Sequence, residues 1–176
     1  DVTGIIDMAM HPSDGNIIYA AAWQRERSPT NRIYGGEESG LYRSLDGGST
    51  WSEMTNGLPV LGSEKGRISI AISQSNPTIL YTRYADATGN IQGVYRSEDG
   101  GDSWENRNSS QLTNVGFHWW FRGIYIDPTN ENIIYNVDFQ VQKSTNGGAS
   151  WSSSFGNVHV DQHAMAFSPT NPDTIL

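Results

Sequence analysis

The stretch Ser44-Leu45-Asp46-Gly47-Gly48-Ser49-Thr50-Trp51 decides the fold, because it returns twice further along the chain. The second copy, at 97–104, reads SEDGGDSW, and the third, at 144–151, reads STNGGASW. The shared pattern is S-x-[DN]-G-G-x-[ST]-W, and the copies begin 53 and 47 residues apart. An invariant Ser, Gly-Gly pair and Trp at such a period indicate an internally repeated fold.

Each copy follows a short alternating run, at 40–43, 93–96 and 140–143. Asp-Gly-Gly or Asn-Gly-Gly after such a run predicts a β-hairpin, because glycine adopts positive φ without steric cost. The Ser and Asp or Asn side chains can bond the backbone of the turn, and the Trp ring can pack between strands. We therefore assign structural roles to Ser44, Asp46, Gly48, Trp51, Ser97, Asp99, Gly101, Trp104, Ser144, Asn146, Gly148 and Trp151.

A second repeated phrase occupies 5–19, 68–81 and 123–135, and begins again at 164. It consists of an apolar run, a Pro/Asn turn and another apolar run. Together the two phrases predict a four-stranded antiparallel meander, which is one propeller blade. The fold class is therefore all-β: a β-propeller section 1–176 with blades at about 5–55, 67–108 and 122–154, an incomplete fourth at 163–176, and no second domain. Propellers close with four to eight blades, so the open edges need the remaining blades or another chain as partner.

The topology of a meander separates two faces. The repeated turns fall on one, and the irregular segments 23–39, 56–67, 84–92, 106–122 and 155–163 fall on the other. Ligand sites concentrate on irregular loops that a rigid scaffold holds, so we expect any ligand on this second face.

Composition narrows the partners. The chain has 176 residues, a formal net charge of −8 and no cysteine. The acidic balance argues against nucleic acid as a partner. No apolar run is long enough to span a membrane, and no residue pattern calls for a cofactor.

The repeated turn resembles the Asp-box, or BNR, repeat of sialidases, xyloglucan-active glycoside hydrolases and sortilin-type Vps10 domains. The phrases 19–25, 39–44 and 159–164 are similar to those of large secreted bacterial BNR-repeat proteins, many labelled glycosyl hydrolases. The resemblance implies a secreted, periplasmic or cell-surface location. It also implies that the turns lie away from the ligand.

Hydrolysis of a glycosidic bond needs two carboxyl groups about 5–10 Å apart. Where the xyloglucan-active enzymes carry an acid, this chain reads Ala20-Ala21-Ala22-Trp23-Gln24. Nothing in the sequence pairs any two of the acids on the loop face, which are Glu26, Glu37, Glu38, Glu64, Asp86, Asp138 and Asp161. The catalytic residues therefore stay unassigned.

Three loop segments carry the candidates for ligand binding. The run 117–122 is the densest in aromatic residues; its rings either pack between blades or, through His118, Trp119 and Trp120, contact a ligand. The segment 23–27 offers Trp23, and Arg25 and Arg27 either hold a carboxylate or form a solvated loop around Glu26.

The third segment contains His159, Asp161 and His163, whose side chains would share one side of an extended chain. They would form a polar network, contact a ligand or, as a weaker alternative, bind a transition metal.

The sequence thus favours a secreted or cell-surface propeller that binds a glycan or a protein segment through its loop face. The alternative is a section of a glycoside hydrolase, similar to xyloglucanases or sialidases, whose catalytic carboxylates lie partly outside this chain.

Overall fold

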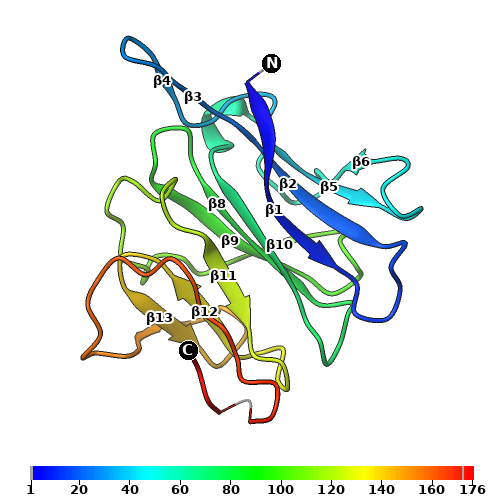
Figure 1. The fold of residues 1–176 in the computed structure, drawn as a ribbon, viewed down its shortest axis with the longest axis vertical. Coiled ribbons are helices and arrows are strands. Elements are labelled where there is room, and N and C mark those ends of the chain that lie inside the picture. Colours follow the sequence, from blue (N-terminus) through cyan, green and yellow to red (C-terminus); the bar gives the residue numbers. More distant parts are fainter. Residues whose placement is uncertain (1, 172) are drawn as a thin grey trace.

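The computed structural model describes residues 2–171 and 173–176; Asp1 and Pro172, which belong to the expected section, lie outside the described residues. Almost all regular structure in it is β (Figure 1). The described residues contain one helical turn, the 3-10 turn η1 (Gly62–Glu64). None of their helical structure has the length and apolarity to cross a bilayer.

Three four-stranded antiparallel sheets follow one another along the chain, as the repeats predict. Each is a meander, with strands in sequence order. The first contains β1 (Thr3–Met10), β2 (Ile18–Gln24), β5 (Gly40–Ser44) and β6 (Ser52–Glu53). The second contains β7 (Ile68–Ile72), β8 (Leu80–Ala85), β9 (Ile91–Ser97) and β10 (Glu105–Arg107). The third contains β11 (Gly123–Ile126), β12 (Ile134–Val137), β13 (Val141–Ser144) and β14 (Ser152–Ser153).

Two features differ from a plain series of meanders. The segment after β2 forms its own small hairpin, β3 (Glu26–Arg27) with β4 (Arg32–Ile33), which projects at the upper left of Figure 1. The C-terminal segment has a single bridge between Phe167 and Ile175 where the next blade begins. The hairpin was not expected, because residues 23–39 carry no long alternating pattern.

The repeated turn is held by its own side chains. In the first copy, Ser44 Oγ donates to Asp46 Oδ1 at 2.8 Å and accepts from Gly48 N at 2.8 Å. Asp46 Oδ1 also accepts from Thr50 N at 2.8 Å. Gly47 and Gly48 have φ of 72° and 92°, the left-handed region that favours glycine. These side chains are committed to the turn.

The third copy shows that Asn replaces Asp without loss of the turn. Asn146 Oδ1 accepts from Ser144 Oγ and from Ser150 N, both at 2.9 Å. Its amide Nδ2 donates to Ser150 Oγ at 2.8 Å, where the second carboxylate oxygen of Asp46 accepts from a hydroxyl. The neutral amide thus replaces the carboxylate contact for contact.

The two repeated phrases meet at one end of each sheet. The first glycine of each turn's Gly-Gly pair donates its N–H to a carbonyl of the Pro/Asn turn of the same sheet: Gly47 to Asn16, Gly100 to Thr78 and Gly147 to Asn132, at 2.9–3.0 Å. The short turns therefore share one face, as the topology predicts.

Apolar cores lie between successive sheets. One joins Leu41 of the first sheet to Ile68 and Leu80 of the second, and another joins Val94 of the second to Ile134 of the third. Both faces of β8 are covered, so all six of its residues are buried. The first strands adjoin one another, β1 against β7 and β7 against β11.

The Trp of the repeated turn differs in exposure between the three sheets, which reveals an open side. Trp104 and Trp151 are each 7% exposed because they pack between two sheets. Trp51 is 41% exposed because no described sheet precedes the first. Ile5, Met8 and Met10 of β1 are also exposed.

Candidate functional site

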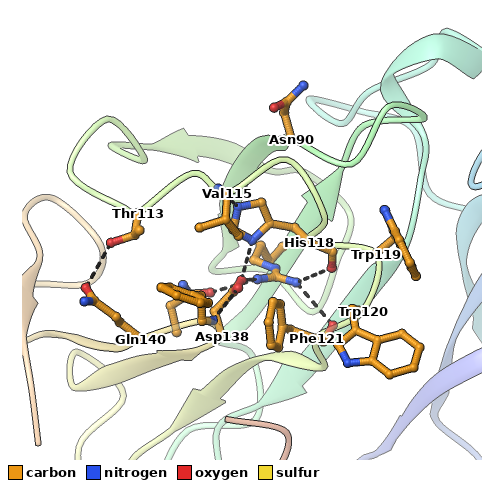
Figure 2. A network of polar contacts seen from close by, with 12 residues as sticks. Asn90, Thr113, Val115, His118, Trp119, Trp120, Phe121, Asp138 and Gln140 are labelled. Atoms are coloured by element: carbon orange, nitrogen blue, oxygen red, sulfur yellow. Dashed lines mark hydrogen bonds and ion pairs between the residues drawn. The ribbon is translucent and has the colours of Figure 1, made fainter. Parts of the chain in front are cut away.

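The aromatic segment 113–122 is fixed to the scaffold by a buried polar network (Figure 2). Arg83 of β8 forms an ion pair with Asp138, the residue that follows β12, and both side chains are almost fully buried. Arg83 Nη2 also donates to the carbonyls of His118 and Phe121, at 3.2 and 3.3 Å. One guanidinium thus joins the second sheet, the third sheet and the segment between them.

His118 completes the network. Its Nε2 accepts from Val115 N at 3.0 Å, so the proton resides on Nδ1, which donates to Asp138 Oδ2 at 2.6 Å. Burial opposes the charge of Asp138, but Arg83 and then His118 outweigh it, and the pKa of Asp138 is lowered. Both nitrogens of the His118 ring, the Asp138 carboxylate and both Nη groups of Arg83 are thus used for structure, while Arg83 Nε is buried without a partner.

Trp119 and Trp120 follow His118 and lie to one side of the network (Figure 2). Trp119 stacks on Tyr34, the residue after β4, with ring centroids 4.2 Å apart and planes 9° apart. Trp120 meets Trp119 edge to face at 5.7 Å and His163 at 5.9 Å. Trp120 is 47% exposed, so much of its ring faces solvent.

The backbone of this aromatic pair is also held. Arg67, just before β7, donates from Nη1 to the carbonyls of Trp119 and Trp120 at 3.2 and 3.0 Å. Gly89 has φ of 96°, and a Cβ there would come within 2.6 Å of Trp119 Cδ1. The 84–92 loop therefore has no room for a side chain at this point.

These contacts enclose a hollow of about 170 Å³, which we name the aromatic pocket. Residues of the first sheet, the segments before and after the second sheet, and the C-terminal segment line it. They are Ile6, Trp23, Arg25, Arg67, Trp119, Trp120 and His163.

Five of the nine predicted ligand-binding residues therefore come together: Trp23, Arg25, Trp119, Trp120 and His163. Trp23 is only 5% exposed, and its Nε1 donates to Tyr34 O at 2.7 Å. The guanidinium carbons of Arg25 and Arg67 lie 5.0 and 5.8 Å from the Trp23 ring centroid. Both distances are within cation–π range.

The other four candidates do not reach the pocket. Arg27 is exposed in β3, opposite Arg32. His118 is fully buried, because its ring contacts Asp138 of the Arg83–Asp138 ion pair. It is therefore out of reach of a ligand. His159 lines a different hollow beside Phe139 and Phe155.

The expected alignment of His159, Asp161 and His163 does not occur. Asp161 has φ of 71°, so the chain is not extended there and the three side chains do not share one side. Instead His163 stacks on Phe121 at 5.3 Å. Across the described ranges, no three His, Cys, Asp or Glu side chains are grouped as metal ligands.

No carboxylate lines the aromatic pocket in the described residues. Asp138 is buried against Arg83, which rules out the exposed acid expected at this position. Asp86 accepts hydrogen bonds from Thr88 and Asn90 within its own turn, and these lower its pKa although burial acts to raise it. Glu37 Oε1 accepts from Gly62 N at 3.1 Å.

Sequence reasoning missed Arg67, Arg83 and Tyr34. A lone Arg in the otherwise uncharged strand 80–85, and an Asp directly after the apolar run 133–137, together signal a buried ion pair. Arg67 and Tyr34 have no comparable local signal, because their partners are about 50 and 85 residues away in the chain.

Comparison with known proteins identifies the fold. No family model matches the chain, and no curated protein matches it by sequence. Among solved structures, it is similar to an ancestral GH74 enzyme, with a TM-score of 0.68 and 19% identity over 97% of this chain and 23% of the other. It is also similar to the GH74 xyloglucanase of Xanthomonas campestris, with a TM-score of 0.57 and 17% identity over 85% of this chain and 20% of the other.

A third similar structure is that of YCF48 bound to a D1 peptide, with a TM-score of 0.55 and 15% identity over 86% of this chain and 40% of that one. These proteins are propellers, so the three sheets are blades of a β-propeller section. The chain spans less than half the length of each of them, which is consistent with further blades completing the propeller.

Proposed function

We propose that this chain belongs to a secreted or cell-surface propeller that binds a glycan or a protein segment in the aromatic pocket. One observation carries the proposal: residues of the first sheet, of the segments before and after the second sheet and of the C-terminal segment converge on one hollow. Ligand sites in proteins are concave, rich in aromatic side chains and equipped with a few polar groups, and this pocket has that composition.

The position of the pocket supports the same proposal. It is built from the irregular segments, while the side chains of the repeated turns are used within the turns themselves. The structural neighbours include a xyloglucanase and a propeller bound to a peptide, so propellers of similar shape serve both kinds of ligand.

The second candidate function is a section of a glycoside hydrolase, which the likeness to GH74 structures favours. In that case, the catalytic carboxylates would lie partly outside this chain, because no acid of the described residues lines the aromatic pocket.

One experiment separates the two functions. The complete protein and its Trp120→Ala variant are tested for retention on, and sugar release from, a panel of immobilised polysaccharides and peptides. Retention without release, weakened at least about tenfold by Trp120→Ala, supports the binding function. Release of reducing ends supports the hydrolase, and equal retention of both proteins removes the pocket from the proposal. Leu61→Ala, which truncates an exposed apolar side chain outside the pocket, is the matched control.

A further inference from the structure

The aromatic pocket carries two arginine side chains whose hydrogen-bonding capacity is largely unused. Arg25 forms no side-chain hydrogen bond or ion pair with the described residues, and its Nε is buried without a partner. Arg67 uses one nitrogen, Nη1, to hold the carbonyls of Trp119 and Trp120. The Nη groups of Arg25 and Nη2 of Arg67 form no hydrogen bond with the described residues, so they are free to donate to an incoming acceptor.

Positive charge is in excess around the pocket, which also favours an acceptor that carries negative charge. Burial first, and then the positive charges of Arg83, Arg122 and Arg25, lower the pKa of Arg67 to about 10, although Asp7 raises it. Asp7 is engaged by Arg122 at 3.2 Å and by Ile70 N at 3.1 Å. The other nearby buried acid, Asp138, is paired with Arg83. A chain of net charge −8 thus places uncompensated positive charge at one hollow.

The walls of the pocket fit a saturated ring. Trp120 offers a half-exposed indole, while Tyr34 covers one face of Trp119. The volume of about 170 Å³ is enough for one ring-sized group. An extended peptide would need a long groove or a free strand edge beside it, whereas this hollow is compact.

We infer that the aromatic pocket binds a sugar residue that carries a carboxylate, with Arg25 and Arg67 holding the carboxylate and Trp120 packing on the ring. Guanidinium groups bind carboxylates through paired, charge-assisted hydrogen bonds, which gives such a site preference over a neutral sugar. The inference rests on the proposed function and adds the class of ligand to it.

The test uses one pair of ligands that differ only in the carboxylate and a second pair that differ by an acidic side group. Binding of the complete protein is measured by titration calorimetry with oligogalacturonate and with its fully methyl-esterified form, and with acidic 4-O-methylglucuronoxylan oligosaccharides beside neutral xylo-oligosaccharides. We expect the acidic member of at least one pair to bind at least about tenfold more tightly. Equal affinity for acidic and neutral members in both pairs overturns the inference and leaves the proposed glycan-binding function intact.

Variants assign the preference to the pocket. Arg25→Gln should reduce affinity for the acidic sugar about tenfold and affinity for the neutral sugar much less, because the side chain forms no hydrogen bond or ion pair with the described residues and the Trp23 ring is its structural contact. Arg27→Gln, on the neighbouring exposed strand, should change neither. An acidic preference that survives Arg25→Gln together with Arg67→Gln overturns the inference. Binding of an acidic peptide but of no sugar also overturns it, and binding of neither overturns the proposed function as well.

Discussion

Asp138 accepts a hydrogen bond from His118 at 2.6 Å, although the two residues belong to different segments and both are buried. With Arg83 as counter-ion, this contact fixes the segment that carries Trp119 and Trp120. The position of the exposed aromatic rings therefore depends on a buried polar network.

Asp138→Asn should destabilise the protein by about 3–5 kcal/mol, because it leaves the buried charge of Arg83 without a counter-ion. The free energy of unfolding, from urea denaturation of the complete protein, checks this. Asp161→Asn changes an exposed acid of the same charge and should have little effect. A change below about 1 kcal/mol for Asp138→Asn would contradict the assigned role.

Acid should weaken the repeated turns over a defined pH range. Hydrogen bonds from Thr50 lower the pKa of Asp46 to about 2, and those from Ser103 lower the pKa of Asp99 to about 2 against the opposing effect of burial. A pKa lowered by folding stabilises the folded state above the ordinary value of 3.8, and this stabilisation is lost as the pH falls toward 2.

Asp46→Asn combined with Asp99→Asn should therefore flatten the loss of stability between pH 4 and 2, because Asn146 already makes the same contacts without a charge. Thermal unfolding across this range measures the effect. An unchanged pH profile would show that other acids control the acid sensitivity.

The three turn tryptophans should be energetically alike in the complete protein. Trp104→Ala and Trp151→Ala each remove a ring buried between two blades and should cost about 3–5 kcal/mol. We expect a similar cost for Trp51→Ala, because a preceding blade would cover Trp51 as the first blade covers Trp104. A cost near 1 kcal/mol for Trp51→Ala would show that this side stays open.

Gly89→Ala should disturb the aromatic pocket and the segment that carries it, because the added Cβ would also meet Gly116 O at 2.7 Å. The added Cβ would meet Trp119 at 2.6 Å, and the backbone φ of 96° disfavours any residue other than glycine. Retention on the panel ligand should fall at least tenfold, and Gly156→Ala, with nothing within 4 Å of its Cβ, is the matched control. Unchanged retention would show that Trp119 adjusts without consequence for binding.

The blades could be predicted from the sequence because their signals are local. A turn such as 44–51 holds itself together with its own side chains, so eight residues suffice to indicate it. The gathering of loops on one face follows from strand order alone. It correctly brought Trp23, Arg25, Trp119, Trp120 and His163 into one neighbourhood.

The details of the site could not be predicted, because they depend on partners far apart in the chain. Within the run 117–122, nothing local shows that His118 points inward and Trp120 outward; Arg83, 35 residues earlier, decides it. Proximity in the sequence predicts that Arg27 shares a ligand site with Arg25, whereas in the structure Arg67 does. The unforeseen hairpin of β3 and β4 carries Arg27 away from the pocket.

The most direct test of the aromatic pocket is an experimental structure of the complete protein with a panel ligand that it retains. We predict density for the ligand against the exposed ring of Trp120, with an acidic group at the guanidinium groups of Arg25 and Arg67. A ligand bound at another part of the loop face, or between carboxylates of other blades, would contradict the assignment of the pocket as the binding site.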